Sequence, residues 1–245
     1  MFLGKDIITV QRINTPEILD SDACPPEDVT ASLRDMSRIN RWFGGVATTR
    51  KMIERVARDT GQKQFSVLEV AAGFGEVPRI AAQQLARSGI SLHLTHLDRA
   101  HSHLLPGQRA VVADALALPF PDNAFDLVSC SLFAHHLEPD ELKRFAAEAL
   151  RVSRCAVLIN DLVRHPLHLA FVYAGFPLMR SYVSRFDGPA SVRRAYVPDE
   201  MQRMLSSGVG VSTRIEISRH FLFRMGVTVW KPTAESSLQR SPNGR

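Results

Sequence analysis

Short apolar runs alternate with stretches of helical period from Ser66 onward, and this alternation constrains the fold more than any other feature. Five runs rich in Val, Leu and Ile are predicted to be strands, and they start at Ser66, Ser91, Ala110, Phe125 and Cys155. Continuous apolar runs are typical of strands that are covered on both faces. Strands that alternate with helices form a parallel sheet. We therefore expect an α/β fold with a doubly wound sheet.

The helices between these strands have clear sequence signals. After the first strand, one apolar stripe is formed by Val77, Ile80, Ala81 and Leu85. Pro78 lies in the first turn, and Gly89 follows the end. Residues 138–152 give a second helix, with Pro139 early and Arg151 in its last turn. That helix should lead directly into the fifth strand.

The C-terminal part predicts an antiparallel hairpin at the edge of the sheet. Residues 211–218 and 221–230 have strand patterns and are separated only by Arg219 and His220. Such a connection is too short for a parallel crossover and suits a hairpin. Residues 233–245 lack periodicity, and we expect a disordered tail there.

A chain of 245 residues can form one domain with additions. We assign residues 1–60 to a helical N-terminal extension and residues 61–232 to the main domain. The extension contains an amphipathic helix that ends at Gly44 and Gly45. Within the main domain, an apolar insert at about residues 162–200 is placed where a lid could lie.

Composition excludes several classes of protein. The hydrophobic share of 45% and the charged share of 22% are those of an ordinary globular protein. No apolar run reaches the ~20 residues of a membrane span, and the N-terminus lacks a signal-peptide pattern. Cys130 and Cys155 lie in predicted strands, which fits a reducing compartment. We expect a cytoplasmic protein.

The net charge of +5 raises the question of nucleic-acid binding. The Lys and Arg residues are scattered, and no basic run is interleaved with aromatic residues. A soluble basic surface is therefore favoured over a nucleic-acid interface.

Residues 67–78 end a strand, make a glycine turn and open a helix. Backbone N–H groups and the positive end of a helix dipole face a ligand at such a turn, which indicates a nucleotide-type ligand. Asp98 closes the second strand 23 residues beyond Gly75. This is close to the ~20-residue spacing at which a carboxylate accepts hydrogen bonds from ribose hydroxyls.

The turn lacks the dinucleotide pattern G-x-G-x-x-G, because Pro78 stands at the third glycine position after Gly73 and Gly75. Glu76 would also place a negative charge near a pyrophosphate, whereas a cationic ligand would avoid this repulsion. A nicotinamide dinucleotide remains the weaker alternative.

The segment from Glu69 to Gly75 resembles the E/D-x-G-x-G-x-G signature of class I S-adenosylmethionine (SAM)-dependent methyltransferases. Asp98, Asp114 with Ala115, residues 131–137 and the terminal hairpin follow in that family's order, so the resemblance covers about Ser66 to Trp230. It implies a Rossmann-like fold with SAM as the cofactor. The cofactor-binding residues it implies are Glu69, Ala71, Gly73, Gly75, Asp98, Arg99, Asp114, Ala115 and Ser131.

Ala71 departs from the signature, since it occupies the first glycine position. Alanine fits if its φ is negative, whereas a positive φ would strain it. A protein of this fold that binds SAM without catalysis is therefore kept as an alternative.

His135 and His136 follow the fourth strand, at the sheet edge where ligands bind in open α/β folds. An imidazole there could act as a general base for a phenolic acceptor, and we prefer His136 to His135. Their alternative role is that of ordinary polar loop residues. Asp161 and His165 could meet the acceptor or cap the next segment, and Trp42 with Phe43 could cover the cofactor or simply pack.

The apolar stretch 167–179, with Phe171, Tyr173, Phe176 and Met179, could wall an acceptor pocket, rest on a membrane surface or pack in the core. We predict methyl transfer to a small, hydrophobic and phenol-like molecule. An RNA or protein substrate is the alternative, based on the basic pI and on Arg180, Arg185, Arg193 and Arg194. No metal site is expected, because the histidines are scattered. Oligomeric state stays open.

Overall fold

The computed structural model describes residues 10–20, 24–210 and 213–232. Its strands are β1 (Gln64–Val70), β2 (Ser91–Asp98), β3 (Ala110–Val112), β4 (Phe125–Ser131), β5 (Ser153–Leu162), β6 (Ile215–His220) and β7 (Arg224–Trp230). Its α-helices are α1 (Pro26–Trp42), α2 (Gly45–Thr60), α3 (Glu76–Ala86), α4 (Pro139–Val152), α5 (Pro166–Ala174), α6 (Tyr182–Arg194) and α7 (Pro198–Gly208). Short 3-10 turns are η1 (Ile18–Asp20), η2 (His101–His103), η3 (Ala134–His136) and η4 (Phe176–Leu178).

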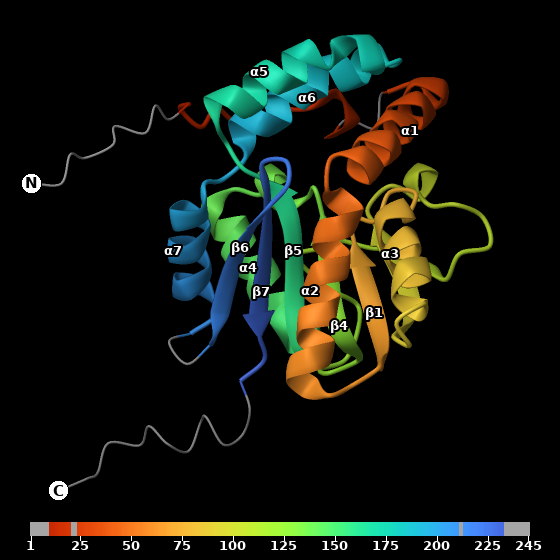
Figure 1. The fold of residues 1–245 in the computed structure, drawn as a ribbon, viewed down its shortest axis with the longest axis vertical. Helices are drawn as coiled ribbons and strands as arrows, with labels where there is room; N and C mark the ends of the chain where they lie inside the picture. Colours follow the sequence, from red (N-terminus) through yellow and green to blue (C-terminus); the bar gives the residue numbers. More distant parts are fainter. Residues whose placement is uncertain (1–9, 21–23, 211–212, 233–245) are drawn as a thin grey trace, which may run out of the picture.

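The strands form one seven-stranded sheet in the order β3-β2-β1-β4-β5-β7-β6 (Figure 1). The first five strands are parallel, and β7 pairs antiparallel with both β5 and β6. The predicted Rossmann-like α/β sheet with a terminal hairpin is therefore confirmed. The strand order reverses between β1 and β4, which is the point where open α/β sheets bind ligands.

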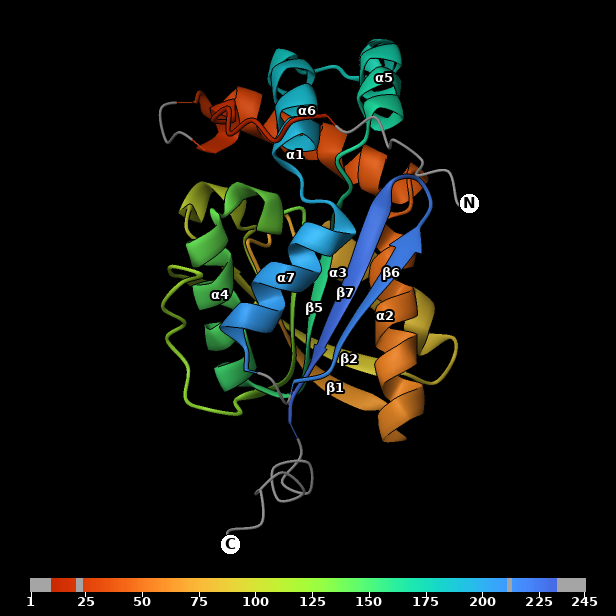
Figure 2. The ribbon, with the colours of Figure 1, turned by 90° about the vertical axis from the view of Figure 1, so that its left-hand side faces the viewer.

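Helices cover both faces of the sheet (Figure 2). On one face α2 packs against α3, β5 and β7, whereas on the other α4 packs against α7, β4 and β5. The central strands are buried completely, as shown by Leu68, Val128 and Leu158. This rigid sheet fixes the positions of the loops at its carboxyl edge.

A helical cap lies over that carboxyl edge, at the top of Figure 1. It consists of η1, α1, α5, η4 and α6, and α6 contacts α1, α5, η1 and η3. The insert expected at about residues 162–200 supplies α5, η4 and α6. The cap therefore combines the insert with part of the N-terminal extension.

The hairpin differs from the prediction in its turn. Arg219 and His220 belong to β6, because His220 pairs with Arg224, so the connection is Phe221 to Phe223. The prediction that Arg219 and His220 form the turn is wrong, since the ladder extends two residues further than the apolar alternation. Residues 211–212 and the expected tail at 233–245 lie outside the described residues.

Residues 45–60 form α2, which packs on the sheet rather than in the cap. Its buried apolar positions include Met52, Ile53 and Val56, and their spacing is the sequence signal that identifies it. The division of the chain at residue 60 stays a prediction.

Candidate functional site

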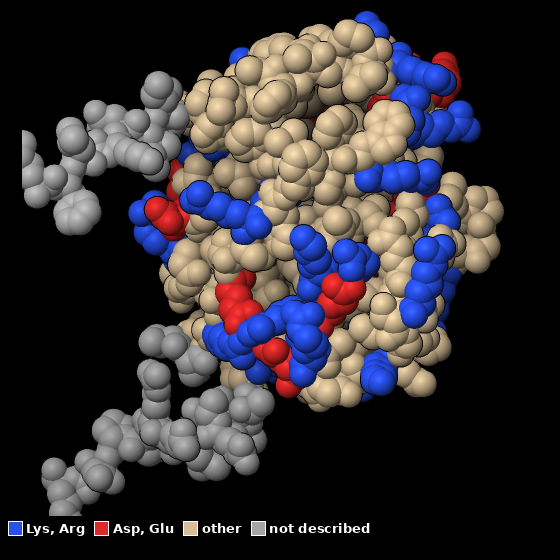
Figure 3. Space-filling model, viewed as in Figure 1, with Lys and Arg blue, Asp and Glu red and all other residues tan. Residues whose placement is uncertain are grey.

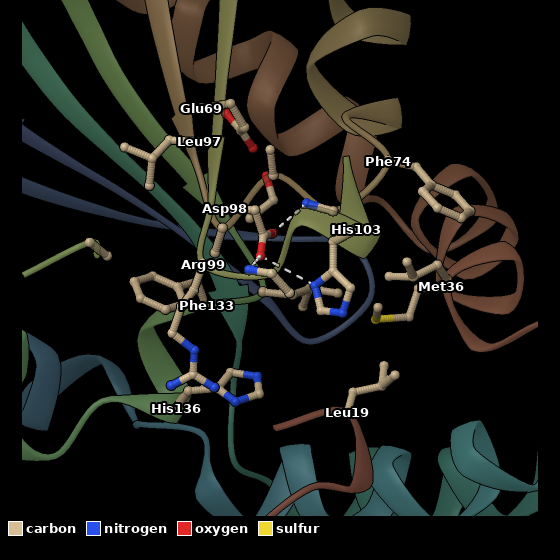
Figure 4. A pocket seen from close by; sticks show the side chains of 18 of the residues that line it. Leu19, Met36, Glu69, Phe74, Leu97, Asp98, Arg99, His103, Phe133 and His136 are labelled. Carbon is tan, nitrogen blue, oxygen red and sulfur yellow. Dashed lines mark hydrogen bonds and ion pairs between the residues drawn. The ribbon is translucent and has the colours of Figure 1, made fainter. Parts of the chain in front are cut away.

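A cavity of about 560 Å³ opens at the carboxyl edge, between the ends of β1 and β4. The sheet side is lined by the loops after β1, β2, β3 and β4, and the cap side by η1, α1 and the end of α6. Figure 4 shows Glu69 and Asp98 on the sheet side, with Leu19 and Met36 across from them. The cavity thus lies between the sheet and the cap.

The glycine turn after β1 has the conformation that the sequence predicts. Gly73 and Gly75 have φ values of +51° and +64°, in the left-handed region that favours glycine. A Cβ at Gly75 would approach the His96 ring nitrogen Nε2 to 2.4 Å. Gly75 itself does not line the cavity, but it lets the turn pass over β2 and start α3.

Ala71 also has a positive φ, +51°, and lines the cavity. The condition under which alanine would fit without strain, a negative φ, is therefore not met. The turn forces the same left-handed conformation that a glycine would adopt, at a cost of roughly 1–2 kcal/mol for a residue with a Cβ.

Asp98 ends β2 and is held by three hydrogen bonds. Its carboxylate accepts from the Gly73 N–H at 2.9 Å, from the Ala100 N–H at 3.1 Å and contacts His103 Nδ1 at 3.2 Å. Burial acts to raise the pKa of Asp98, but these hydrogen bonds outweigh it and lower the pKa. A carboxylate offers about four acceptor positions, so the anion retains one acceptor position toward the cavity.

Glu69 lies at the cavity floor and is almost fully buried. Burial raises its pKa to about 7, against a lowering contribution from the Ser129 hydroxyl, which donates to the carboxylate. At neutral pH this carboxyl is therefore close to half ionised, and a nearby cation would favour the ionised form.

The other four residues that the resemblance implies for cofactor binding also line the cavity: Arg99, Asp114, Ala115 and Ser131. The Asp114 carboxylate accepts from the Leu116 N–H at 2.8 Å, and the Arg99 guanidinium donates to the Asp20 carbonyl at 3.1 Å. Eight of the nine residues thus share one wall, with Gly75 behind it.

His136 lines the same cavity at the cap end. Its Nδ1 lies 2.8 Å from Asp20 Oδ1, and the Arg194 guanidinium donates to the other Asp20 oxygen at 2.7 Å. Burial alone would raise the pKa of Asp20, but its contacts with His136 and Arg194 hold that pKa well below its usual range. The His136 ring is thus oriented by an ionised carboxylate.

His135 has a different environment and does not line the cavity. It is 2% exposed, its Nδ1 lies 2.7 Å from Asp161 Oδ1, and its Nε2 lies 3.4 Å from Glu17 Oε1. Burial acts to lower the pKa of His135, but the two carboxylates raise it to about 10. The ring is therefore a buried imidazolium, which has no free site to accept a proton.

Within the described ranges, one group of side chains brings potential metal ligands within 4.8 Å of one another: Glu17, His135 and His136. Glu17 also accepts from the Ser191 hydroxyl, and Arg194 lies 3.9 Å from the same carboxylate. Each imidazole is paired with a carboxylate through Nδ1. These contacts form one network of three carboxylates, two imidazoles and the Arg194 guanidinium.

Several residues with a proposed role in acceptor or cofactor binding lie elsewhere. Trp42, Phe171 and Tyr173 are exposed, and neither they nor Met179 lines the cavity. His165 caps α5, where its Nδ1 accepts from the Leu167 N–H at 3.2 Å. The idea that residues 167–179 wall this pocket is therefore wrong, because the insert packs above it.

Sequence reasoning missed the contribution of the cap to the site. Glu17, Leu19 and Asp20 come from a stretch without periodicity, and Arg194, one of the arginines behind the RNA or protein alternative, is only 5% exposed. Their contacts with His135 and His136 span more than 50 residues of sequence. Among the cap residues of the site, only Leu33 and Met36 have a sequence signal, since they lie on the apolar stripe of α1.

Comparisons with known proteins agree with this arrangement. A family model described as "Methyltransferase domain" matches residues 68–155. A demethylmenaquinone methyltransferase of Renibacterium salmoninarum is 32% identical over 185 residues, which are 72% of this chain and 70% of that protein.

Solved structures share the fold. A SAM-dependent methyltransferase from Aquifex aeolicus has a TM-score of 0.55 at 17% identity, covering 85% of this chain and 100% of that one. The plantazolicin methyltransferase BpumL, solved with a substrate analogue and S-adenosylhomocysteine (SAH), has a TM-score of 0.60 at 12% identity, with coverages of 84% and 96%. Together with the curated relative and the glycine turn, they identify the chain as a member of the class I SAM-dependent methyltransferases.

Proposed function

We propose that the chain methylates a hydroxyl-bearing aromatic small molecule of phenol or quinol type, with His136 as the general base. Oxygen is the proposed methyl acceptor, with a ring carbon of the same ionised molecule as the alternative. The observation that carries the proposal is the pair His136–Asp20, 2.8 Å apart, at the cap end of the cavity that the glycine turn opens.

The residues around the glycine turn fit SAM. The left-handed Gly73 places backbone atoms at the cavity, where they could approach the ligand, and Asp98 has acceptor capacity left for a ribose hydroxyl. Glu69 would stay ionised beside the positive charge of the ligand. When bound, SAM supplies a methyl group activated by its sulfonium. We assign Asp114 and Ala115 to the adenine and Ser131 to the methionine side.

His136 then has one task, which is to remove the proton of the acceptor hydroxyl. A phenol of pKa near ~10 is mostly protonated at neutral pH, so a base within hydrogen-bond reach makes its oxygen nucleophilic. Asp20 contacts Nδ1, so Nε2, which lies 3.7 Å from Glu17 Oε2, is the nitrogen that would take the proton. The Asp20 carboxylate would also stabilise the charge that the ring gains. Phe133 and Leu137 beside it keep water away from the acceptor.

The acceptor class is supported by the apolar side of the cavity, where Leu19, Leu33 and Met36 face the sheet loops. The curated relative is by its printed name a demethylmenaquinone methyltransferase, and this name also describes a quinone-type acceptor. Of the four arginines behind the RNA or protein alternative, Arg194 is buried against Asp20 and does not contribute to a basic surface.

The test uses SAM with an isotopically labelled methyl group and a panel of alkylated phenols and quinols. We expect at least one panel member to gain the label, and we expect His136→Asn to lower kcat for it by about 10²-fold or more. SAH affinity should stay within about twofold, since the ring does not hold the cofactor. His101→Asn, at an exposed histidine outside the cavity, is the matched control and should keep full activity.

If His136→Asn turns over at the unaltered rate, His136 is not a general base. Alignment of the acceptor with the methyl group is then the source of the rate enhancement. Label transfer to RNA with none to the panel would reject the acceptor class. The pH profile separates these cases, because loss of a base abolishes the rise of kcat on the acidic limb.

A further inference from the structure

The cap carries a surface of large apolar side chains that none of the described residues covers. Six of them are each between 45% and 58% exposed, and we call them the apolar cap surface: Leu167, Phe171, Tyr173, Leu178, Tyr182 and Phe186. They belong to α5, η4 and the first half of α6, which pack against each other. Monomeric proteins rarely expose so many large apolar residues together without a partner.

Helix α5 shows why these residues stay exposed. Its sequence is apolar on every side and contains no charged residue, yet only His168 is buried. An apolar helix of this kind is normally found inside a core or against lipid. Here it rests on the hairpin tip through its contact between Phe171 and Phe223, with ring centroids 5.9 Å apart, and its outer side is uncovered. Phe221, at the same tip, is 69% exposed.

The charges on this segment have one sign. From Val163 to Phe186 the sequence contains three arginines and no Asp or Glu, and of these Arg164 is buried whereas Arg180 and Arg185 are exposed. Asp28 borders the surface, with its carboxylate 3.4 Å from the Tyr182 hydroxyl. In Figure 3 the surface over α5, at the top of the molecule, has few charged side chains.

We propose that the apolar cap surface docks on an anionic phospholipid bilayer. Exposed aromatic and aliphatic side chains would enter the interface, while Arg180 and Arg185 would lie against the lipid phosphates. This inference concerns the cap alone, and it does not depend on the acceptor or on His136. It would bring the cavity beneath the cap to a surface where hydrophobic acceptors dissolve.

A second copy of the chain fits this surface less well than lipid does. In a symmetric dimer the surface would face itself. Arg180 and Arg185 would then face the same two arginines across an apolar interface, and the segment has no carboxylate to pair with them. An anionic lipid surface supplies the missing negative charge.

The test is co-sedimentation of the full chain with vesicles of phosphatidylglycerol and phosphatidylcholine, and with pure phosphatidylcholine, in the absence of any acceptor. We expect binding to the mixed vesicles that weakens with salt. The double variant Phe171→Glu with Leu178→Glu should bind at least tenfold more weakly, and Arg180→Gln about fivefold more weakly. Leu105→Glu, at an exposed leucine in the loop after η2, is the control and should bind like the unaltered chain.

Thermal unfolding and SAH binding of the double variant establish that it is folded. The proposal is overturned if the unaltered chain does not bind the mixed vesicles, or if the double variant binds them as strongly. It is also overturned if the surface mediates a dimer, which the double variant would convert to a monomer, without vesicle binding. None of these outcomes bears on methyl transfer.

Discussion

At the scale of single residues, the loops of the site hold side chains in conformations that cost free energy. Ala71 and Leu132 both have positive φ values, +51° and +57°, and both line the cavity, one after β1 and the other after β4. Left-handed residues with a side chain concentrate at functional sites, where the surrounding structure enforces them. The two turns thus shape the cavity at the expense of local stability.

Ala71→Gly should therefore stabilise the protein. Relief of a left-handed Cβ is worth roughly 1–2 kcal/mol, and the greater entropy of glycine in the unfolded chain offsets about 0.4–1 kcal/mol of it. We expect the free energy of unfolding in urea to rise by about 0.5–1 kcal/mol. SAH binding should be retained.

The neighbouring alanine provides the control for this change. Ala72 is not among the left-handed residues, so Ala72→Gly should lower stability by about 0.4–1 kcal/mol. A destabilised Ala71→Gly variant would show that the backbone at this position does not carry the strain.

The residue pattern predicted the sheet wall of the site but not its cap wall. Glycine, carboxylate and strand order carry local signals, and Gly73, Asp98 and Asp114, which these signals indicate, all lie in the cavity wall. Glu17 and Asp20 reach the site through contacts with residues more than 100 positions away, and no local pattern encodes such contacts. The sequence also does not show that His135 is buried whereas His136 lines the cavity, because long-range contacts decide burial.

At the scale of elements, the sequence again predicts what local patterns encode and does not predict what long-range contacts decide. Strands β1 to β5 follow directly from apolar runs, and α3 and α4 from their stripes and terminal residues. Helices α5 and α6 lack an amphipathic pattern, since one is apolar throughout and the other mixes polar and apolar residues on every side. Helix α6 packs against α1 and η1, and α5 packs against α6, and the sequence pattern shows none of these contacts.

His135 joins three elements, and its charge controls how firmly they are joined. The imidazolium bridges η3 to Asp161 in β5 and to Glu17 beside η1. Its folded pKa of about 10 exceeds the ordinary value of 6.5, so protonation favours the folded state. This contribution is complete below about pH 6.5 and is lost as the pH rises toward 10.

Proton NMR of the imidazole Cε1–H signals can measure this charge. We expect the His135 signal to show no titration between pH 5.5 and 8.5, whereas an imidazole of ordinary pKa near ~6.5 would lose its proton within that range. Urea midpoints should fall from pH 7 to pH 10. A His135 signal that titrates near pH 6.5 would contradict the ion-pair interpretation and reopen this residue as a base.

At the scale of the whole molecule, a rigid parallel sheet supplies one wall of the cavity and a helical cap supplies the other (Figures 1 and 4). Among the residues that the structure describes, no helix is long and apolar enough to cross a membrane. In the proposed function each wall has its own role, because the glycine turn and Asp98 would bind the cofactor and Asp20 with His136 would act on the acceptor.

Calorimetric titration with SAH measures whether the cavity at the glycine turn binds SAM through Asp98. We predict one SAH per chain for the unaltered protein, no binding of NAD, and at least tenfold weaker SAH binding by Asp98→Asn. The matched control is Asp126→Asn, which alters a carboxylate that accepts a backbone N–H at the opposite end of the sheet and should leave SAH affinity unchanged. Absence of SAH binding, or equal SAH affinity of Asp98→Asn and the unaltered protein, would contradict SAM binding through Asp98.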